Sequence, residues 1–332
     1  MAATVKPLTE FPILNPPPRR YQGPIVDAHM HSKDLPSIQA YWDVGESIYG
    51  VRNVVAIVDL ATAIELRKAY GGRVQPAVWG ISPRQENFKD LAGFRKAKEA
   101  HLEQIAAEGF RIVKLWFTPR FHEWSNMRLD DPALDFFFER IRALRLSILI
   151  HVADPDYWFA NRINDLEQHG SKAEQYMQLT ARLEQFPEIN IQGAHFGGDP
   201  EHLDHLASLL ERYPNYYLDS SATKWVAREF SRHGPAARDF LIRFPDRVLF
   251  GTDLVANPDR EKEGKREHYA TRFYVHQMMW EQTGSFDSPI EDEDSLEPPR
   301  FEGLNLPESV LANLYWDNAA RLYGFTESTV SK

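Results

Sequence analysis

The chain has 332 residues, of which 43% are hydrophobic and 26% are charged, and it carries no cysteine and a formal net charge of −10. This composition is typical of an ordinary globular protein, and the acidic surplus argues against nucleic acid or an anionic membrane surface as a partner. The absence of cysteine excludes disulfides, thiolate nucleophiles and cysteine-ligated zinc, so metal chemistry must use histidine and carboxylate ligands.

Residues 1–22 are rich in proline and include the basic pair Arg19-Arg20. This composition predicts an extended arm that lies over the body of the protein. The first residues lack the apolar stretch of roughly 7–15 residues that marks a signal peptide, and no apolar run approaches the roughly 18 residues of a membrane span. We therefore expect a cytoplasmic protein.

From residue 23 onward, apolar runs alternate with helical patterns. The runs predicted to be strands cover residues 25–31, 53–60, 74–81, 110–117, 147–153, 189–196, 215–221 and 247–254. Helices are predicted at 87–108, 132–144, 172–186, 200–213 and 224–244. Eight strands that alternate with helices in a chain of this length predict an α/β protein with a single (β/α)₈ TIM barrel, residues 23–332.

A doubly wound open sheet is the alternative architecture. No G-x-G-x-x-G follows the first strand, and no G-x-x-x-x-G-K-[ST] loop occurs, so a nucleotide-phosphate site is not supported. The G-x-S-x-G elbow of many serine hydrolases is also absent.

The C-terminal part differs from the barrel repeats. A helix is predicted around 267–281, and the acidic, proline-bearing segment 285–299 is expected to be a solvated loop after the last strand, with a lid over the active site as the alternative. A closing helix is predicted at 307–323, and Gly324 is in the expected C-terminal position.

The first predicted strand carries an unusual set of polar residues. Successive side chains of a strand point to opposite faces, so Asp27, His29 and His31 share one face of the run 25–31. Two neighbouring imidazoles at a strand end can bind one divalent cation. The alternative is an ordinary strand with incidental histidines.

Four further polar residues lie near the C-terminal ends of later predicted strands: Lys114, His151, His195 and Asp253. Each has an ordinary alternative, because a histidine can be a core residue, an aspartate can cap a helix and a lysine can reach solvent. Barrel enzymes build their active sites at the C-terminal ends of the strands. The convergence of these residues therefore favours a metal site.

Weaker candidates follow the third and fourth strands. Arg84 and Arg120 are candidates for binding a substrate carboxylate, with surface ion pairs as the alternative. Trp116 is a candidate wall of a substrate pocket, with ordinary packing as the alternative, and His122 is a further candidate pocket residue.

The Asp-x-His-x-His motif, His151, His195 and the run Gly251-Thr252-Asp253 together resemble the amidohydrolase superfamily. With the closing stretch 316–324, the chain is most similar to the amidohydrolase-related branch that includes the aminocarboxymuconate-semialdehyde decarboxylase type. The resemblance implies that His29, His31, His151 and Asp253 bind one divalent metal, with zinc favoured and manganese or iron as alternatives. It also implies that His195 is an acid/base or carbonyl-polarising group, and that the protein forms a homodimer.

Two residues have open roles within this resemblance. In binuclear members a lysine on the fourth strand is carboxylated and bridges two metals, which would place Lys114 and His195 at a second metal. A structural or substrate-contacting Lys114 is the favoured alternative. Asp27 is expected either to turn towards the metal or to orient a metal ligand.

These assignments predict a metal-dependent hydrolase that acts on an amide, lactone or other ester-like bond of a small molecule. Asp253 would take a proton from water, and His195 would stabilise the developing oxyanion. The alternative is a non-oxidative decarboxylase of a small aromatic or unsaturated carboxylic acid. A catalytically silent barrel is the third hypothesis.

Overall fold

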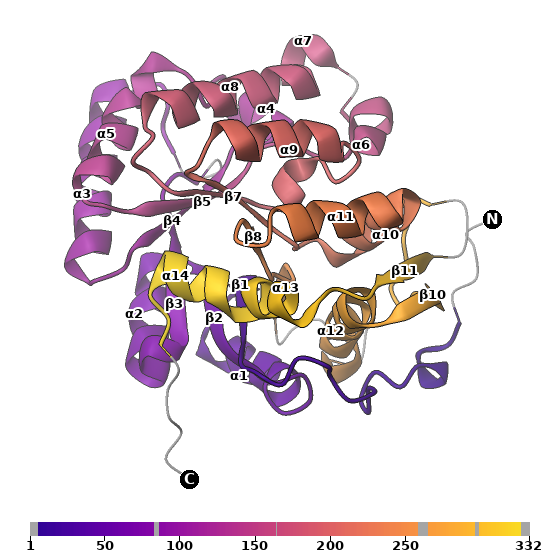
Figure 1. Cartoon of the computed structure of the whole chain (residues 1–332). Helices are drawn as coiled ribbons and strands as arrows, with labels where there is room; N and C mark the ends of the chain where they lie inside the picture. Colours follow the sequence, from indigo (N-terminus) through magenta and orange to yellow (C-terminus); the bar gives the residue numbers. More distant parts are fainter. Residues whose placement is uncertain (1–5, 83–85, 164, 258–264, 296–298, 327–332) are drawn as a thin grey trace. The chain divides into compact units, whose positions relative to one another are not determined.

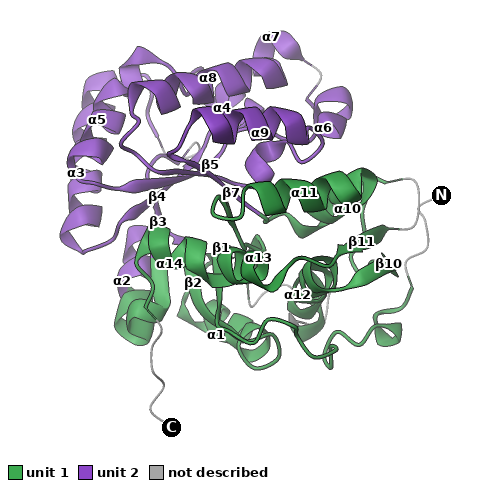
Figure 2. Ribbon diagram, viewed as in Figure 1, with its two compact units in different colours: residues 1–56, 65–75, 220–332 green, residues 57–64, 76–219 purple. Residues whose placement is uncertain are grey.

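The computed structural model describes residues 6–82, 86–163, 165–257, 265–295 and 299–326. The chain forms two compact units, which Figure 2 colours separately. Unit 1 comprises residues 1–56, 65–75 and 220–332, and unit 2 comprises residues 57–64 and 76–219. In both units the strands are largely buried, and apolar side chains such as Val26 and Ile148 form the core.

The described residues contain one sheet of nine strands. These are β1 (Ile25–Ser32), β2 (Val51–Val58), β3 (Val74–Trp79), β4 (Ile112–Trp116), β5 (Ser147–His151), β6 (Ile191–Gly193), β7 (Tyr216–Asp219), β8 (Val248–Leu249) and β9 (Leu254–Ala256). Helices separate most of these strands along the chain (Figure 1). The predicted fold class, an α/β TIM barrel, is confirmed.

The described helices begin and end as follows: α1 (Leu35–Gly45), α2 (Leu60–Tyr70), α3 (Leu91–Ala107), α4 (Pro119–Ser125), α5 (Asp135–Ala143), α6 (Asp156–Asn161), α7 (Leu166–His169), α8 (Lys172–Gln185), α9 (Leu203–Arg212), α10 (Thr223–His233), α11 (Pro235–Arg243), α12 (Lys265–Glu281), α13 (Glu308–Ala312) and α14 (Asn318–Tyr323). A π-helical turn, η5 (Asn313–Asp317), joins α13 to α14.

The prediction of a single helix at 224–244 is wrong. Gly234 has φ +51° and ψ −116°, which ends α10, and Pro235 begins α11.

In unit 2 the strands lie side by side in the order β7-β6-β5-β4-β3. They are parallel, and β4 pairs with β5 so that Lys114 lies opposite Leu149 and Trp116 lies opposite His151. Residues opposite each other in neighbouring strands share a face of the sheet, as do residues two apart in one strand. Lys114, Trp116 and His151 therefore point to the same face.

In unit 1 the order is β2-β1-β9, and the eighth predicted strand, 247–254, is interrupted. Residues 250–253 separate β8 from β9 and bond to β1. Ala28 donates its N–H to the Phe250 carbonyl oxygen at 2.7 Å, and Thr252 and Asp253 donate theirs to the His29 carbonyl oxygen at 3.2 and 2.8 Å. Asp253 has φ +58°, a left-handed conformation that is uncommon outside glycine. This turn places the Asp253 side chain beside β1.

The acidic segment after α12 is not the solvated loop that was expected. Its first residues belong to β10 (Thr283–Asp287), which pairs antiparallel with β11 (Arg300–Leu304). Ser288 and Asp294 are buried, and Arg228 of α10 forms an ion pair with Asp292. The acidic side chains are thus partly neutralised by basic residues of a neighbouring helix, which the charge pattern of the segment alone did not reveal.

Residues near the N-terminus contact the rest of unit 1 through backbone oxygens. Tyr49 donates its hydroxyl to the Ile13 carbonyl oxygen at 2.5 Å, and Gln277 donates to the Pro17 carbonyl oxygen at 2.6 Å.

Every helix in the described ranges is too short or too polar to cross a membrane.

Candidate metal centre

Unit 1 brings together three of the predicted metal ligands. The Nε2 atoms of His29 and His31 lie 3.4 and 3.2 Å from Oδ1 of Asp253. The two imidazole rings are 5.6 Å apart between centroids. His29 is fully buried, whereas the His31 and Asp253 side chains are about one quarter to one third exposed. Three donor atoms therefore converge on one point that a small ligand can reach from one side.

Asp27 connects β1 to the turn that carries Asp253. Its carboxylate accepts hydrogen bonds from the Thr252 hydroxyl at 2.6 Å, the Tyr41 hydroxyl at 2.8 Å, and the backbone N–H groups of His29 and Thr252, both at 3.1 Å. Burial raises the pKa of Asp27 to about 6, although these hydrogen bonds oppose the shift. Asp27 thus fixes the backbone of His29 and of Thr252, which are next to or among the candidate ligands.

Small residues leave room for the His29 ring. A Cβ atom at Gly251 would lie 2.9 Å from the Cβ atom of His29, so only glycine allows this approach of the turn to β1. Ser221 Oγ lies 3.0 Å from His29 Nδ1 and hydrogen-bonds to it. The other ring nitrogen, Nε2, is the atom that faces Asp253.

Unit 2 brings together the other two candidate histidines. The rings of His151 and His195 meet edge to face with centroids 4.4 Å apart. His151 ends β5, and its Nε2 atom lies 3.2 Å from Asp154 Oδ1. His195 follows β6 and has φ +59°, a left-handed conformation. Its backbone N–H donates to Asp219 Oδ1 at 3.0 Å, which holds this unusual turn in place.

The loop after His195 depends on close backbone approach. Gly198 has φ +80°, and a Cβ atom there would lie 2.1 Å from the Ala153 carbonyl oxygen. Gln192 donates to the second oxygen of Asp219 at 2.5 Å, so both carboxylate oxygens have partners. The segment that presents His195 is therefore rigidly packed against the end of β5.

Lys114 is buried in β4, with an exposed fraction of only 2%, and lies on the face that His151 also occupies. This position does not distinguish a bridging from a structural lysine.

We expect one equivalent of metal per chain in the wild-type protein and in Lys114→Met, measured by inductively coupled plasma mass spectrometry. Two equivalents in the wild type that fall in Lys114→Met would show instead that Lys114 bridges a binuclear site.

The weaker candidates for substrate binding do not all lie near the candidate ligands. Trp116 is half-buried, with its ring 6.4 Å from His151 and 5.4 Å from the half-exposed Trp124. His122 Nδ1 lies 2.6 Å from the Gln168 carbonyl oxygen, and Arg120 is exposed on α4. Of these residues, Trp116 lies beside a candidate ligand. Arg84 lies outside the described residues.

A second cluster of possible ligands in unit 2 is an ion-pair network. Asp156, Asp199 and His202 place donor atoms within 4.8 Å of one another. The Lys172 ammonium group lies 2.7 Å from Asp156 and 2.6 Å from Asp199. Burial alone would lower the pKa of Lys172, but Asp199 and Glu201 outweigh it and raise the pKa. The lysine therefore supplies the positive charge that these carboxylates require.

Four residues that contact the candidate site residues Asp27, His29, His151 and His195 were not identified from the sequence: Tyr41, Asp154, Asp219 and Ser221. Asp219 and Ser221 lie in the predicted strand 215–221, so their position at a strand end was a usable signal. Tyr41 lies on α1, and no local pattern connects it with Asp27.

The donor atoms of unit 1 fit a divalent metal ion. Imidazole nitrogen and carboxylate oxygen are common ligands of zinc and also suit manganese and iron. The Ser221 hydroxyl group holds His29 Nδ1 and so fixes the ring, a role that carboxylates, backbone carbonyls or water usually have for metal-binding imidazoles.

A family model described as amidohydrolase matches residues 51–325. The chain belongs to the amidohydrolase family. It is therefore an enzyme of the amidohydrolase superfamily, as the resemblance implied. The matched region begins after β1, so the Asp-x-His-x-His motif of this amidohydrolase lies outside it. No curated protein sequence matches the chain.

Solved structures with the same fold cover nearly the whole chain. The 5-carboxyvanillate decarboxylase from Sphingomonas paucimobilis is 15% identical, covers 91% of this chain and 99% of its own, and has a TM-score of 0.51. The enzyme of the same name from Novosphingobium aromaticivorans, solved with manganese and 4-hydroxy-3-methoxy-5-nitrobenzoic acid, is 12% identical, covers 92% and 97%, and has a TM-score of 0.54. An uncharacterised TIM-barrel protein from Bordetella bronchiseptica is 15% identical, covers 91% and 99%, and also has a TM-score of 0.54. At these identities the similarity shows the fold alone.

Proposed function

We propose that this amidohydrolase is a metal-dependent enzyme, and that His29, His31, His151 and Asp253 hold one divalent cation. The observation that carries the proposal is the convergence of His29 Nε2 and His31 Nε2 on one oxygen of Asp253. Because barrel enzymes assemble their sites from the C-terminal ends of several strands, His151 at the end of β5 is the fourth proposed ligand.

The cation we propose is zinc, with manganese as the alternative. Zinc commonly binds imidazole and carboxylate together, and the chain has no thiolate that would select a softer site. Manganese is supported by its presence in the decarboxylase from Novosphingobium aromaticivorans. A bound divalent cation would supply a Lewis acid that polarises a substrate oxygen.

For the reaction, we propose non-oxidative decarboxylation of a flat, unsaturated carboxylic acid. Support comes from Trp116, whose ring lies beside His151, and from the neighbouring ring of Trp124, because the two rings offer an apolar surface to a planar substrate. The two decarboxylases with the same fold act on an aromatic acid by their names, which also favours this class.

The chain's own residues would supply the proton for this step. In decarboxylation the bond between carbon and the carboxylate breaks, carbon dioxide leaves, and a proton takes its place on carbon. His195 is the proposed proton donor, because its ring contacts that of the proposed ligand His151 and its backbone is fixed by Asp219. The donor then regains a proton from solvent.

Hydrolysis of an amide, lactone or ester is the second candidate. It is favoured by Asp253, whose side chain is about one third exposed and borders both histidines of β1, so that it could accept a proton from water and pass it to a leaving group. Both candidates use the same residues, and the products distinguish them.

The test compares products and a variant of His195. With the zinc- or manganese-loaded enzyme, we expect 5-carboxyvanillate or a related aromatic acid to release one carbon dioxide per acid consumed, measured by a coupled carbon dioxide assay. In His195→Asn, kcat should fall by about 10²–10⁴-fold while the metal content stays unchanged. Asparagine tolerates the left-handed backbone at this position, so the fold should persist.

Two results would contradict this proposal. Turnover of lactones or amides without release of carbon dioxide would establish the hydrolase instead. Loss of metal in His195→Asn would make His195 a metal ligand and not a proton donor.

A further inference from the structure

Unit 1 contains a cavity at the end of β1 that is opposite to His29 and His31. The cavity has a volume of about 450 Å³. Pro24 directly precedes β1, Arg52 lies at the start of β2, and Arg73 directly precedes β3. β1 rises about 3.3 Å per residue, so roughly 20 Å of strand separates this cavity from His31. The cavity is therefore distinct from the candidate metal centre.

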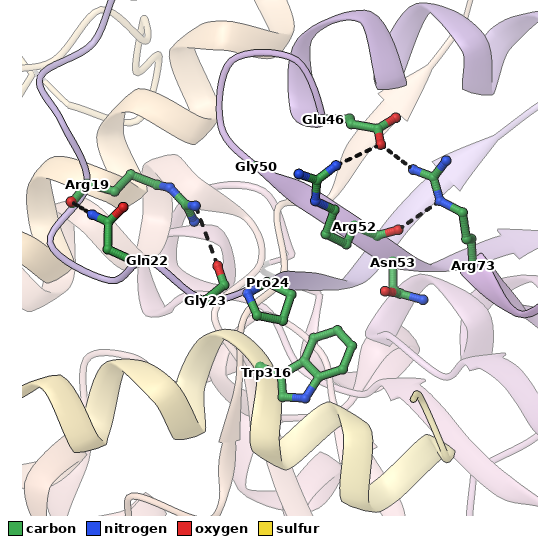
Figure 3. Close-up of a pocket in the computed structure, with 10 residues that line it drawn as sticks. All are labelled: Arg19, Gln22, Gly23, Pro24, Glu46, Gly50, Arg52, Asn53, Arg73 and Trp316. Atoms are coloured by element: carbon green, nitrogen blue, oxygen red, sulfur yellow. Dashed lines mark hydrogen bonds and ion pairs between the residues drawn. The ribbon is translucent and has the colours of Figure 1, made fainter. Parts of the chain in front are cut away.

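We call this space the arginine cavity and define it by Arg19, Pro24, Glu46, Arg52, Arg73 and Trp316. Figure 3 shows Glu46 between the guanidinium groups of Arg52 and Arg73. The Glu46 carboxylate lies 3.1 Å from Arg52 and 2.9 Å from Arg73. One carboxylate balances one guanidinium group, so the three arginines leave a surplus of positive charge at the cavity.

The arginines differ in how firmly they are held. Arg73 is fixed, because it also donates to the Arg52 carbonyl oxygen at 3.1 Å and stacks over the Trp42 ring at 4.6 Å. The Arg52 side chain is 52% exposed and has Glu46 as its ion-pair partner. Arg52 is therefore the guanidinium group that can turn towards a ligand.

Arg19 has a guanidinium nitrogen that is not used within the described residues. Its Nη2 atom donates weakly to the Gly23 carbonyl oxygen at 3.4 Å, whereas Nη1 is buried and has no hydrogen-bond partner there. A Cβ atom at Gly50 would lie 2.6 Å from Arg19 Nη2, so this glycine, with φ +74°, leaves space for the guanidinium group. Glu281 interacts with Arg19 electrostatically. The hydrogen bonds that the Glu281 carboxylate accepts, however, come from the Arg20 backbone N–H and the Tyr315 hydroxyl.

An apolar wall completes the arginine cavity. Trp316 belongs to the π-helical turn η5, and Figure 3 shows its ring next to that of Pro24. Such turns occur mostly as local insertions in helices and are frequent at functional sites. A cavity with a flat apolar wall and convergent polar groups is typical of a small-molecule site.

We propose that the arginine cavity binds a small organic anion, whose carboxylate or phosphate group is held by Arg19 and Arg52 and whose flat apolar part lies against Trp316. Guanidinium groups bind both anion types through paired N–H donors. A bound anion would accept a hydrogen bond from Arg19 Nη1. It would also balance the positive charge of the arginines that Glu46 does not neutralise. An unsatisfied buried donor carries a free-energy cost, so this contact stabilises the complex.

The test is isothermal titration calorimetry of the full chain at low ionic strength. The probes are benzoate, phenyl phosphate, inorganic phosphate and the uncharged benzamide. We expect benzoate or phenyl phosphate to bind with a stoichiometry of one, inorganic phosphate to bind more weakly, and benzamide not to bind. The ratio of the benzoate and phenyl phosphate affinities shows which of the two anionic groups the cavity prefers.

Variants locate the binding. Arg52→Gln and Arg19→Gln should each weaken binding by at least about tenfold, because each removes a charge-assisted hydrogen bond. Arg95→Gln is the matched control, since Arg95 is an exposed residue of α3 in an ion pair with Glu99 at 3.0 Å. It should bind the probes as the wild type does.

The candidate metal centre also attracts anions, so the same titration is made with Asp253→Asn. Binding that persists in Asp253→Asn and weakens in Arg52→Gln supports the proposal. The proposal is overturned if no organic anion binds saturably, if Arg95→Gln weakens binding as much as Arg52→Gln, or if only Asp253→Asn abolishes it.

Discussion

Asp253→Asn is expected to lose the bound metal ion and to lower kcat/KM by at least about 10³-fold, since the carboxylate is a proposed ligand for both candidate reactions and, for hydrolysis, also the proton acceptor. Asparagine has the same shape but lacks the negative charge that attracts a divalent cation. It also tolerates the left-handed backbone of this position, where φ is +58°. Metal content by inductively coupled plasma mass spectrometry and steady-state kinetics measure the two effects.

The matched control is Asp246→Asn, which changes an exposed aspartate of the same unit. Its metal content and turnover should equal those of the wild type. If Asp253→Asn keeps a full equivalent of metal and near-wild-type turnover, Asp253 is neither a ligand nor a catalytic residue, and the proposed centre is wrong.

Arg182→Met is expected to have the largest effect on stability, about 3–5 kcal/mol in the free energy of unfolding. Arg182 lies on α8 and is 1% exposed. Its guanidinium group donates to the carbonyl oxygens of Leu129 and Asp131 at 2.8 and 2.7 Å and forms an ion pair with Asp135 at 2.5 Å. Methionine fills similar space but removes the ion pair with Asp135 and both buried hydrogen bonds to carbonyl oxygens.

Urea unfolding followed by circular dichroism measures this loss, and Arg212→Met is the control. Arg212 also pairs with a glutamate, Glu184 at 2.7 Å, but its side chain is 69% exposed. Surface ion pairs contribute about 0–1 kcal/mol, so the control should change stability little. Equal losses in the two variants would show that the buried hydrogen bonds of Arg182 do not stabilise unit 2.

Much of the barrel followed from local patterns. The strands predicted at 25–31 and 147–153 match β1 and β5 within two residues, because buried parallel strands are short apolar runs bounded by polar residues. The two histidines of β1 and the histidine that ends β5 were singled out as candidate site residues because each lies in such a run or at its end. A side chain's face in a strand depends only on the parity of its position.

The connections were less predictable. The acidic segment after α12 was expected to be solvated because its own charges are all of one sign. Its buried positions depend on Arg228, which lies more than sixty residues earlier in α10 and pairs with Asp292. The break between α10 and α11 at Gly234 was missed because a glycine in a helical pattern is compatible with either outcome.

By itself, the sequence determined the alternation of strands and helices and the presence of His29, His31, His151, His195 and Asp253 at strand ends. The tertiary structure decided how these side chains are presented. Asp253 and His195 adopt left-handed backbone conformations that neither residue prefers locally. Each is held by hydrogen bonds to a distant segment, Asp253 by the carbonyl oxygen of His29 and His195 by the carboxylate of Asp219. Such conformations persist because the surrounding contacts outweigh the local strain, and those contacts exist only in the folded chain.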